Sequence, residues 1–458
     1  MKLIKTHITL ITVLIISILT NAISLAESVD FDIILNKAID YSYDVKIANV
    51  DVGISQADLK IAKSEYYPNL SFIYDTEYVK DLNDPTNQVS SVGSTFINQV
   101  TQFQNLLAFK VNYTLLDYGI RNHKSLLALK DVSLKQILLQ RNLRDLKIKM
   151  ARLYTEALLN YTEIKSNEQL LPIYKELFKS KERLFVAGTS PKLNVMDEAV
   201  KIARTQDTIE STKTKLNDSL QNISVYTNQK YNPSNIELKN YGEETYTPTV
   251  DSNGVHFFKQ RIEKKRYTIN NIRQEETLEY KSYQLEVEKK KHELEVLKRE
   301  RLPTFSLYTN YIFYGTNGDN PLKAISNIGS RNVTVGISAM LPILDGLKNA
   351  ASREKAQLEI KKLELEKEKY SHEALSQFAK LQEQYNLYQN ELLAKEELQS
   401  KWLDKIHALD RLTQNKIVDT TELLNCKAEI LKENIELEKL KINLLSTLKQ
   451  LEILSEDY

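Results

Sequence analysis

Four short segments of the chain alternate between apolar and polar side chains, as β-strands with one apolar face do. The alternation predicts strands at about 68–79, 107–116, 303–314 and 332–344. The apolar positions include Leu70, Phe72, Tyr74 and Tyr78 in the first strand and Val333, Val335, Ile337 and Ala339 in the last. Strands of this length can span an outer membrane when they are tilted. A soluble sheet with one wet face would show the same alternation, so the pattern alone leaves both interpretations open.

Long segments that follow the strands carry apolar residues every three or four positions, which predicts amphipathic helices. These helices cover residues 119–187, 191–226, 347–412 and 418–454, and a further helix precedes each strand pair. At 1.5 Å per residue, the first would extend about 100 Å, a length typical of coiled-coil packing. A solvated pair of long helices is the alternative. It does not explain why amphipathic strands occur at matching places in both halves of the chain.

The same series of features occurs twice along the sequence. Asp117 and Gly119 follow the second predicted strand, Asp345 and Gly346 follow the fourth, and the two aspartates are 228 residues apart. This match predicts a duplication. The first repeat covers 27–227, a connection rich in Pro and Gly covers 228–255, the second repeat covers 256–454, and a short tail covers 455–458. Each repeat is expected to read helix, strand, loop, strand, long helix, turn, helix.

The first 26 residues have the pattern of a secretory signal peptide. Lys2 and Lys5 precede an apolar run from Ile8 to Leu19, and small residues lead up to Ala26. The run is too short for a comfortable membrane-spanning helix, although an uncleaved anchor helix remains the alternative. After residue 27 no apolar stretch approaches such a helix. If the exported chain enters a membrane, it is therefore expected to do so as a closed β-barrel, in which every backbone polar group is paired.

Composition and charge argue against several classes of function. With 62 Lys and Arg against 61 Asp and Glu, the chain lacks the basic excess of a nucleic-acid-binding protein. Only 11 Gly and 9 Pro disfavour a loop-rich enzyme. No motif for a metalloprotease, a nucleophile elbow or a phosphate-binding loop occurs. We therefore expect neither catalysis nor a cofactor or metal. The lone Cys426 and the scattered histidines, His123, His256, His292, His372 and His407, are interpreted as packing or surface residues.

Four strands are too few to close a barrel within one chain, because single-chain barrels begin at eight strands. Three chains would supply twelve, enough for an open lumen. At this point the sequence resembles the TolC-like outer-membrane efflux and type I secretion channel family. The resemblance extends from Glu27 to about Leu454 and is carried by the duplicated layout, the strand-to-helix junctions at 116–119 and 344–346, and the two helix-turn-helix tips.

The resemblance implies a mainly α fold with a small membrane β component. Duplicated long-helix coiled-coil hairpins would form a periplasmic α-barrel, and four strands per chain would contribute to a 12-stranded trimeric transmembrane β-barrel. It also implies a homotrimer in the outer membrane, in contact with outer-membrane lipid, with most of its mass in the periplasm. Such a trimer is the passive exit duct of a tripartite efflux pump or type I secretion system. Its implied partners are a periplasmic membrane-fusion adaptor and an inner-membrane transporter of the RND or ABC type.

The turn between the last two predicted helices resembles the family's periplasmic entrance. Asp419 and Glu422 match two acidic positions that ring the closed mouth, with Glu in place of Asp at the second. Residues three apart share a helix face, so both carboxylates could point to the axis of a trimer and favour cations. The alternative is that both simply stabilise a helix N-terminus. The resemblance further implies adaptor contact at both tips, at Gly188, Thr189, Ser190, Gln414 and Asn415.

A second function remains open from the sequence, namely a periplasmic coiled-coil adaptor or scaffold of a transport complex. Adaptors also have signal peptides and helical hairpins. They carry small Gly-rich β-domains, however, and this chain is poor in Gly. They also have no need for two strand pairs with an apolar face. The sequence therefore favours the outer-membrane duct.

Overall fold

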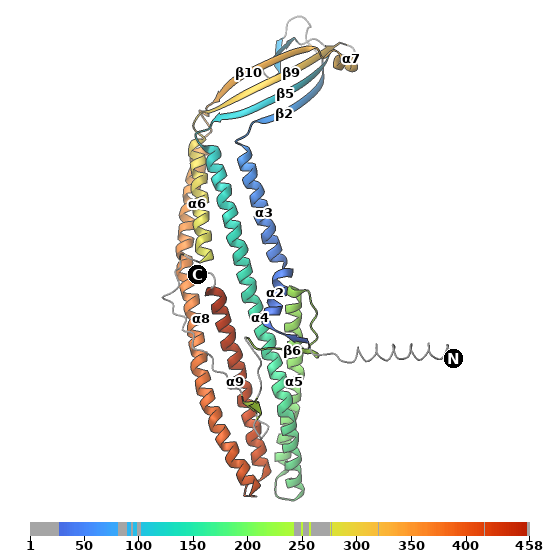
Figure 1. Ribbon diagram of the computed structural model, residues 1–458, viewed down its shortest axis with the longest axis vertical. Helices are drawn as coiled ribbons and strands as arrows, with labels where there is room; N and C mark the ends of the chain where they lie inside the picture. Colours follow the sequence, from blue (N-terminus) through green and yellow to red (C-terminus); the bar gives the residue numbers. More distant parts are fainter. Residues whose placement is uncertain are drawn as a thin grey trace, which may run out of the picture. The chain divides into compact units, whose positions relative to one another are not determined.

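The computed structural model describes residues 27–80, 89–92, 95–98, 102–241, 249–250, 256–257, 275, 277–318, 320–415 and 417–455. The expected signal peptide, residues 1–26, lies outside these described residues, as do parts of the connection between the repeats. Within them, long helices and one four-stranded sheet make up most of the structure (Figure 1). Short two-stranded pairs occur besides, between β3 (Val89–Val92) and β4 (Thr95–Asn98) and between β7 (Thr249–Val250) and β8 (His256–Phe257).

Corresponding helices of the two halves have equal lengths, as a duplication would produce. Helix α3 (Tyr43–Ser64) and helix α6 (Leu278–Arg299) each have 22 residues. Helix α4 (Ile120–Val186) and helix α8 (Lys348–Gln414) each have 67. Helix α5 (Lys192–Thr227) and helix α9 (Thr420–Ser455) each have 36. Helix α2 (Phe31–Tyr41) has no such counterpart among the described residues, and Ser42 separates it from α3.

The four long strands form one antiparallel sheet in the order β10-β9-β5-β2 (Figure 1). Each half supplies one hairpin: β2 (Asn69–Val79) with β5 (Gln102–Leu116), and β9 (Thr304–Asn317) with β10 (Ser330–Met340). The hairpins meet along β5 and β9. A duplicated pair of hairpins therefore becomes a single sheet, with one repeat on each side of its centre.

The sheet and its loops differ from the sequence expectation at several places. Strand β10 ends at Met340 rather than 344, because Pro342 lacks the N–H that a ladder requires. Strand β5 begins at Gln102 rather than 107, since the hairpin register pairs residues 102–106 with residues 75–79 of β2. The loop between β9 and β10 contains an unexpected helix, α7 (Pro321–Ser326), which Asn320 caps by accepting hydrogen bonds from the Leu322 and Lys323 amides.

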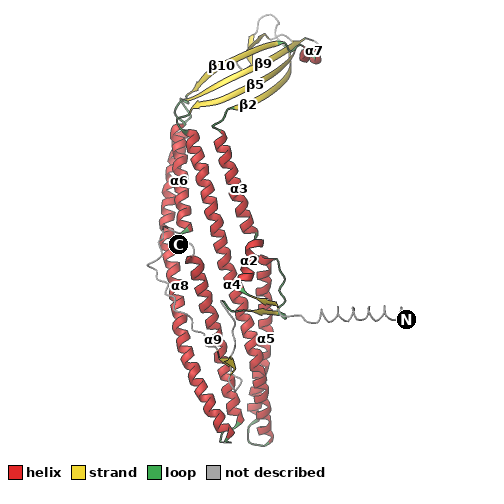
Figure 2. Cartoon of the chain, in the orientation of Figure 1, coloured by secondary structure: helices red, strands yellow, loops and turns green. Residues whose placement is uncertain are grey.

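Two compact units divide the chain, and both repeats contribute to each. One comprises residues 1–48, 139–278 and 370–458, and its largest core packs α2, α4, α5 and α9 with the parallel pair β1 (Glu27–Val29) and β6 (Ile236–Leu238) (Figure 2). In this core the Tyr154 hydroxyl donates to the Val29 carbonyl at 3.1 Å. The other unit comprises residues 49–138 and 279–369 and contains the four-stranded sheet. The pair β1–β6 is absent from the sequence expectation, because each strand has only three residues.

Candidate functional site

One face of the four-stranded sheet is apolar across all four strands. The register places Phe72 opposite Phe109, Phe109 opposite Tyr311, and Tyr311 opposite Val333. The rings of Phe72 and Phe109 pack with centroids 5.1 Å apart. Many side chains on this face are exposed in the single chain: Leu70, Phe72, Tyr74, Tyr78, Phe109, Val333, Val335 and Ile337. A contiguous exposed apolar face of this kind marks a surface that contacts lipid or protein.

Both edges of this sheet are open in the described part of the chain. Strands β2 and β10 each pair with one neighbour only. Three antiparallel pairings separate them, so the two edge strands run in opposite directions. An open edge presents unpaired backbone N–H and C=O groups, which pair with any strand of suitable direction. The β2 edge of one copy therefore fits the β10 edge of another in an antiparallel pairing.

Helix α3 has one buried face and one exposed apolar face. The buried face includes Ala48, Val52 and Ser55. A second stripe, spaced by three, four and seven residues, is exposed: Tyr43, Ile47, Val50, Ile54 and Ile61. Polar residues such as Asn49, Gln56 and Lys60 occupy the third face. A helix that is apolar on two faces is normally covered on both, so the exposed stripe indicates a protein partner.

The first strand-to-helix junction is organised by the buried side chain of Asp117. Its carboxylate accepts from the Gly119 amide at 3.0 Å and from the Arg121 amide at 2.9 Å, and it forms an ion pair with the Arg121 side chain. Burial opposes ionisation, but these hydrogen bonds and the guanidinium outweigh it and lower the pKa of Asp117. Tyr118 and Gly119 turn the chain with φ values of 53° and 89°. The carboxylate therefore fixes the point at which β5 becomes α4.

The second junction repeats the first with different side chains. The Asp345 carboxylate accepts from the Asn349 amide at 2.9 Å, which corresponds to the bond from Arg121 to Asp117. Gly346 and Leu347 have φ values of 65° and 68°. Helix α6 contacts both junctions, because Arg299 donates to the Tyr118 carbonyl and the Leu297 carbonyl accepts from Asn349. Asp117, Gly119, Asp345 and Gly346 thus stand at equivalent turns within one compact unit.

The first tip is a tight helix-to-helix turn. Gly188 has a φ of 76°, the left-handed conformation that ends many helices. The Thr189 amide donates to the Leu184 carbonyl at 3.0 Å and the Gly188 amide donates to Phe185 at 2.9 Å, which is the Schellman pattern. Ser190 accepts from the Asn194 side chain at 3.0 Å. Gly188 and Thr189 are exposed and Ser190 is half-buried, so the turn itself is accessible.

The second tip shares one backbone hydrogen bond with the first, although its sequence looks unrelated. The Ile417 amide donates to the Leu412 carbonyl at 2.9 Å, the counterpart of the bond from Thr189 to Leu184. Asp419 then precedes α9, and its carboxylate accepts from the hydroxyls of Thr421 at 2.7 Å and Thr420 at 3.2 Å. Hydrogen bonding from Thr421 is the main cause of a lowered pKa for Asp419. Asp419 therefore acts as a helix cap that is held ionised.

The remaining predicted residues of the second tip are accessible. Gln414 ends α8 and Asn415 follows it; both are exposed, and the Asn415 amide donates to the Arg411 carbonyl. Glu422 is also exposed, and its amide donates to the Asp419 carbonyl at 3.1 Å. Cys426, one turn further on, is buried with Ile406, Leu409 and Ile430, and this burial raises the pKa of its thiol. Helix capping therefore accounts for an acidic residue at position 419 within one chain, whereas the side chain of Glu422 is exposed.

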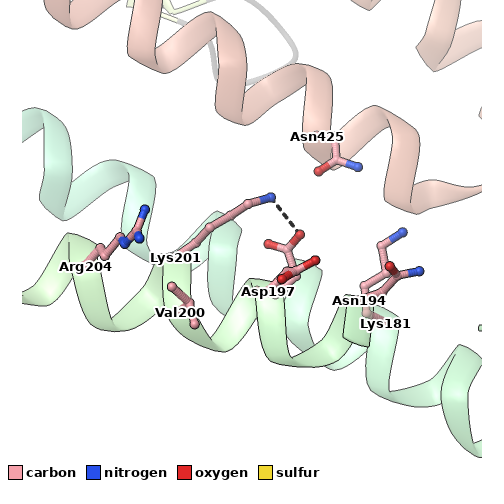
Figure 3. A pocket seen from close by; sticks show the side chains of 8 residues that line it. Lys181, Asn194, Asp197, Val200, Lys201, Arg204 and Asn425 are labelled. Atoms are coloured by element: carbon pink, nitrogen blue, oxygen red, sulfur yellow. Dashed lines mark hydrogen bonds and ion pairs between the residues drawn. The ribbon is translucent and has the colours of Figure 1, made fainter. Parts of the chain in front are cut away.

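A polar cavity of about 440 Å³ lies between the first tip's helices and α9 (Figure 3). Three basic residues, Lys181, Lys201 and Arg204, line it together with Asp197 and the buried Glu198. Lys201 donates to one oxygen of Glu198 at 2.9 Å. The other oxygen of Glu198 is buried and lacks a hydrogen-bond partner among the described residues. The cavity thus offers a buried acceptor that is not used by the residues that the structure describes.

One contact between two histidines was not predicted from the sequence. His123 and His292, which are 169 residues apart, lie with their Nδ1 atoms 3.1 Å from each other. The sequence offered no local spacing between them. The available signal was indirect, because they stand on the helices adjoining β5 and β9, the two strands that join the repeats. Both histidines were interpreted as packing or surface residues, and the sequence did not predict that they meet.

Two searches of the described residues gave negative results. No group of three or more His, Cys, Asp or Glu side chains is arranged to hold a metal ion in the part of the chain that the structure describes. No helix within the described ranges is sufficiently long and apolar to cross a lipid bilayer.

Comparison with known proteins connects these features. Residues 34–229 match the family described as outer membrane efflux protein. No curated protein matches the sequence. A structure reported for CusC, concerning folding and transmembrane channel formation, is similar with a TM-score of 0.68 and 15% identity, covering 92% of this chain and 91% of that one.

Two further solved structures agree in fold. The outer membrane protein VceC from Vibrio cholerae has a TM-score of 0.66 and 11% identity, with 92% of this chain and 96% of that chain covered. The CmeC outer membrane channel from Campylobacter jejuni has a TM-score of 0.71 and 12% identity, with coverage of 93% and 85%. Both repeats are therefore present in the common fold, although the family match lies in the first repeat and extends only two residues beyond it. The expected mainly α architecture is confirmed.

Proposed function

We propose that this chain is a member of the TolC-like outer membrane efflux protein family and that it is the exit duct of a tripartite efflux pump or type I secretion system. The proposed duct is a homotrimer in the outer membrane that conducts exported solutes or proteins passively. One observation carries the proposal: an apolar-faced sheet with two open edges that run in opposite directions. Such a sheet is complete only when neighbouring copies pair with both of its edges.

Closure of the sheet into a ring follows from the strand directions. Each copy offers β2 at one edge and β10 at the other, and these fit each other in an antiparallel pairing. Three copies supply twelve strands, an even number as in known single-chain bacterial barrels. The apolar face with Phe72, Tyr311 and Val333 then meets outer-membrane lipid. The exposed stripe on α3 supports the same assembly, because a neighbouring copy would cover it.

The periplasmic mouth is proposed at the second tip. Three copies would bring six carboxylates, from Asp419 and Glu422, close to one axis. Both side chains are exposed in the single chain, and Asp419 is held ionised by its hydroxyl partners. A ring of fixed negative charge in a narrow passage attracts cations and repels anions. Separation of the tip helices of the second repeat would then open the mouth.

The partners are proposed from the accessible surfaces of the tips. Gly188, Thr189, Ser190, Gln414 and Asn415 form turns whose backbone bonds are satisfied locally, so partner binding need not rebuild them. The polar cavity beside the first tip offers the unpaired oxygen of Glu198 to a donor from outside. A periplasmic membrane-fusion adaptor is the proposed partner there. An inner-membrane transporter of the RND or ABC type supplies the energy that the duct lacks.

Single-channel recordings in planar bilayers test the mouth. The double variant Asp419→Ala with Glu422→Ala should lose much of the cation preference of the wild-type channel, because six negative charges leave the proposed passage. A variant of an exposed acidic residue further from this tip, Glu391→Ala on α8, serves as the control and should keep the wild-type selectivity. Equal selectivity in all three proteins would remove Asp419 and Glu422 from the pore.

Membrane fractionation tests the assignment to a duct independently of the mouth. A duct should sediment with the outer membrane and remain a trimer in detergent. Recovery with the inner membrane or the soluble fraction would support the periplasmic adaptor or scaffold and would overturn the proposed duct.

A further inference from the structure

Two imidazoles face each other across the seam between α4 and α6. The Nδ1 atoms of His123 and His292 are 3.1 Å apart, and the ring centroids are 5.3 Å apart. Both side chains are half-buried, so ions from solvent can reach them. Only one of two neutral imidazoles can donate in this contact while the other accepts. The observed contact is therefore one hydrogen bond, made by the N–H of one imidazole to the nitrogen of the other.

The same geometry suits a transition-metal ion. Two nitrogens that bind one tetrahedral Zn²⁺ at about 2.0–2.1 Å lie roughly 3.3–3.4 Å from each other. The observed Nδ1 separation is only a few tenths of an ångström shorter, as expected for a proton in place of a larger ion. We propose that His123 and His292 form a two-imidazole site for a divalent transition-metal ion such as Zn²⁺ or Cu²⁺, with water completing the coordination.

Charged groups around the pair mostly compensate one another. On α6, Glu288 is paired with Lys130 of α4 at 2.6 Å, and Glu295 is paired with Lys298 at 2.7 Å. Asp131 of α4 contacts Lys289 of α6. These carboxylates have cationic partners, so the imidazoles are the available ligands. A site with neutral nitrogen ligands selects imidazole-preferring metals over Mg²⁺ and Ca²⁺, which require oxygen ligands.

The positive charge of Arg299 acts on His123 and limits the affinity, because it repels an incoming cation. The expected order of affinity is Cu²⁺ above Zn²⁺.

The position of the pair gives the metal a structural role. His123 lies in the second turn of α4, after β5, and His292 lies two turns before the end of α6, which leads into β9. These strands pair with each other and join the two repeats. A bound ion would replace a single hydrogen bond with a cross-link between the helices at the base of the sheet. This role is separate from conduction, because it requires neither the pore nor a partner.

Metal binding to the purified full-length mature protein, prepared in detergent without a histidine tag, tests the proposal. Titration with ZnCl₂ and CuSO₄ by isothermal calorimetry should show one site per chain. His123→Gln and His292→Gln should each weaken binding by at least about ten-fold, since each removes one of two protein ligands. His372→Gln, at an exposed histidine on α8, should bind as the wild type does. Electron paramagnetic resonance of the Cu²⁺ form should show two nitrogen ligands.

Thermal unfolding of the same proteins distinguishes a lost ligand from a misfolded variant. Zn²⁺ should raise the Tm of the wild type and of His372→Gln, and EDTA should reverse the shift. Variants at His123 or His292 should fold without metal but show no Zn²⁺-dependent shift. Unchanged affinity in the double variant His123→Gln with His292→Gln, or no binding to the wild type, would leave only a hydrogen-bonded pair and overturn the site.

Discussion

The carboxylate of Asp419 both caps helix α9 and carries a negative charge. Two substitutions can separate the effect of the cap from the effect of the charge. Asn caps helices about as well as Asp, whereas Ala does not, and loss of a cap costs about 1 kcal/mol. Asp419→Ala should therefore lower the free energy of unfolding by about that amount, and Asp419→Asn should stay close to the wild type. Chemical denaturation followed by circular dichroism measures both. If Asp419→Asn is as unstable as Asp419→Ala, the charge rather than the cap holds this turn.

The pH dependence of stability reports on Asp117. Its pKa in the folded chain lies below the ordinary value of 3.8. A depressed folded-state pKa contributes stability above the unfolded value, and this contribution is lost as the pH falls through the folded value. The Tm of the wild type should therefore fall between about pH 5 and about pH 3, partly through Asp117. Asp117→Asn should show a shallower fall, whereas an equal fall would exclude Asp117 as a source.

Residues that end elements could be identified from the sequence, and residues that meet across elements could not. Asp117, Gly119, Asp345 and Gly346 lie at chain reversals because short polar and Gly residues adopt them locally. His123 and His292 are brought together only by the pairing of β5 with β9. Nothing within a few residues of either histidine encodes that contact.

At the scale of elements, the first tip depends on a backbone conformation that Gly adopts freely. A Cβ at Gly188 would meet no neighbouring atom, so any cost of substitution comes from its φ of 76°. Gly188→Ala should destabilise the protein by about 1–2 kcal/mol, and Gly188→Asn by clearly less, because Asn tolerates the left-handed region. Thermal unfolding of the two variants measures the difference. Equal losses from Ala and Asn would show that the turn relaxes to another conformation.

Long elements were predictable because their periodicity is repeated many times. The expected helix at 119–187 compares with α4 at Ile120–Val186, and the expected strand at 68–79 with β2 at Asn69–Val79. Short elements contain too few repeats of the hydrophobic pattern to be predicted in this way. Helix α7 has six residues and β1 has three, and both are defined by what they pack against or pair with.

At the scale of the whole molecule, the duplication was visible in the sequence but the division into compact units was not. Each repeat is continuous along the chain, whereas each compact unit takes segments from both repeats. The reason is that α4 and α8 each contribute residues to both units. Similarity between the two halves of the sequence identifies which segments were duplicated. Which copied segments lie together is decided by strand pairing and by helix packing, and both act over long separations.

In the proposed trimer, the outward stripe of α3 would become a second interior surface. Ile54 is 55% exposed in the single chain, so a charge there disturbs no contact within it. In a trimer the same charge would be buried without a partner, which is strongly unfavourable. Ile54→Glu should therefore dissociate the detergent-solubilised trimer into folded monomers, as measured by analytical ultracentrifugation with circular dichroism. Gln56→Glu adds the same charge on the polar face of α3 and should remain trimeric. If both variants are trimers, the stripe faces something other than a neighbouring copy.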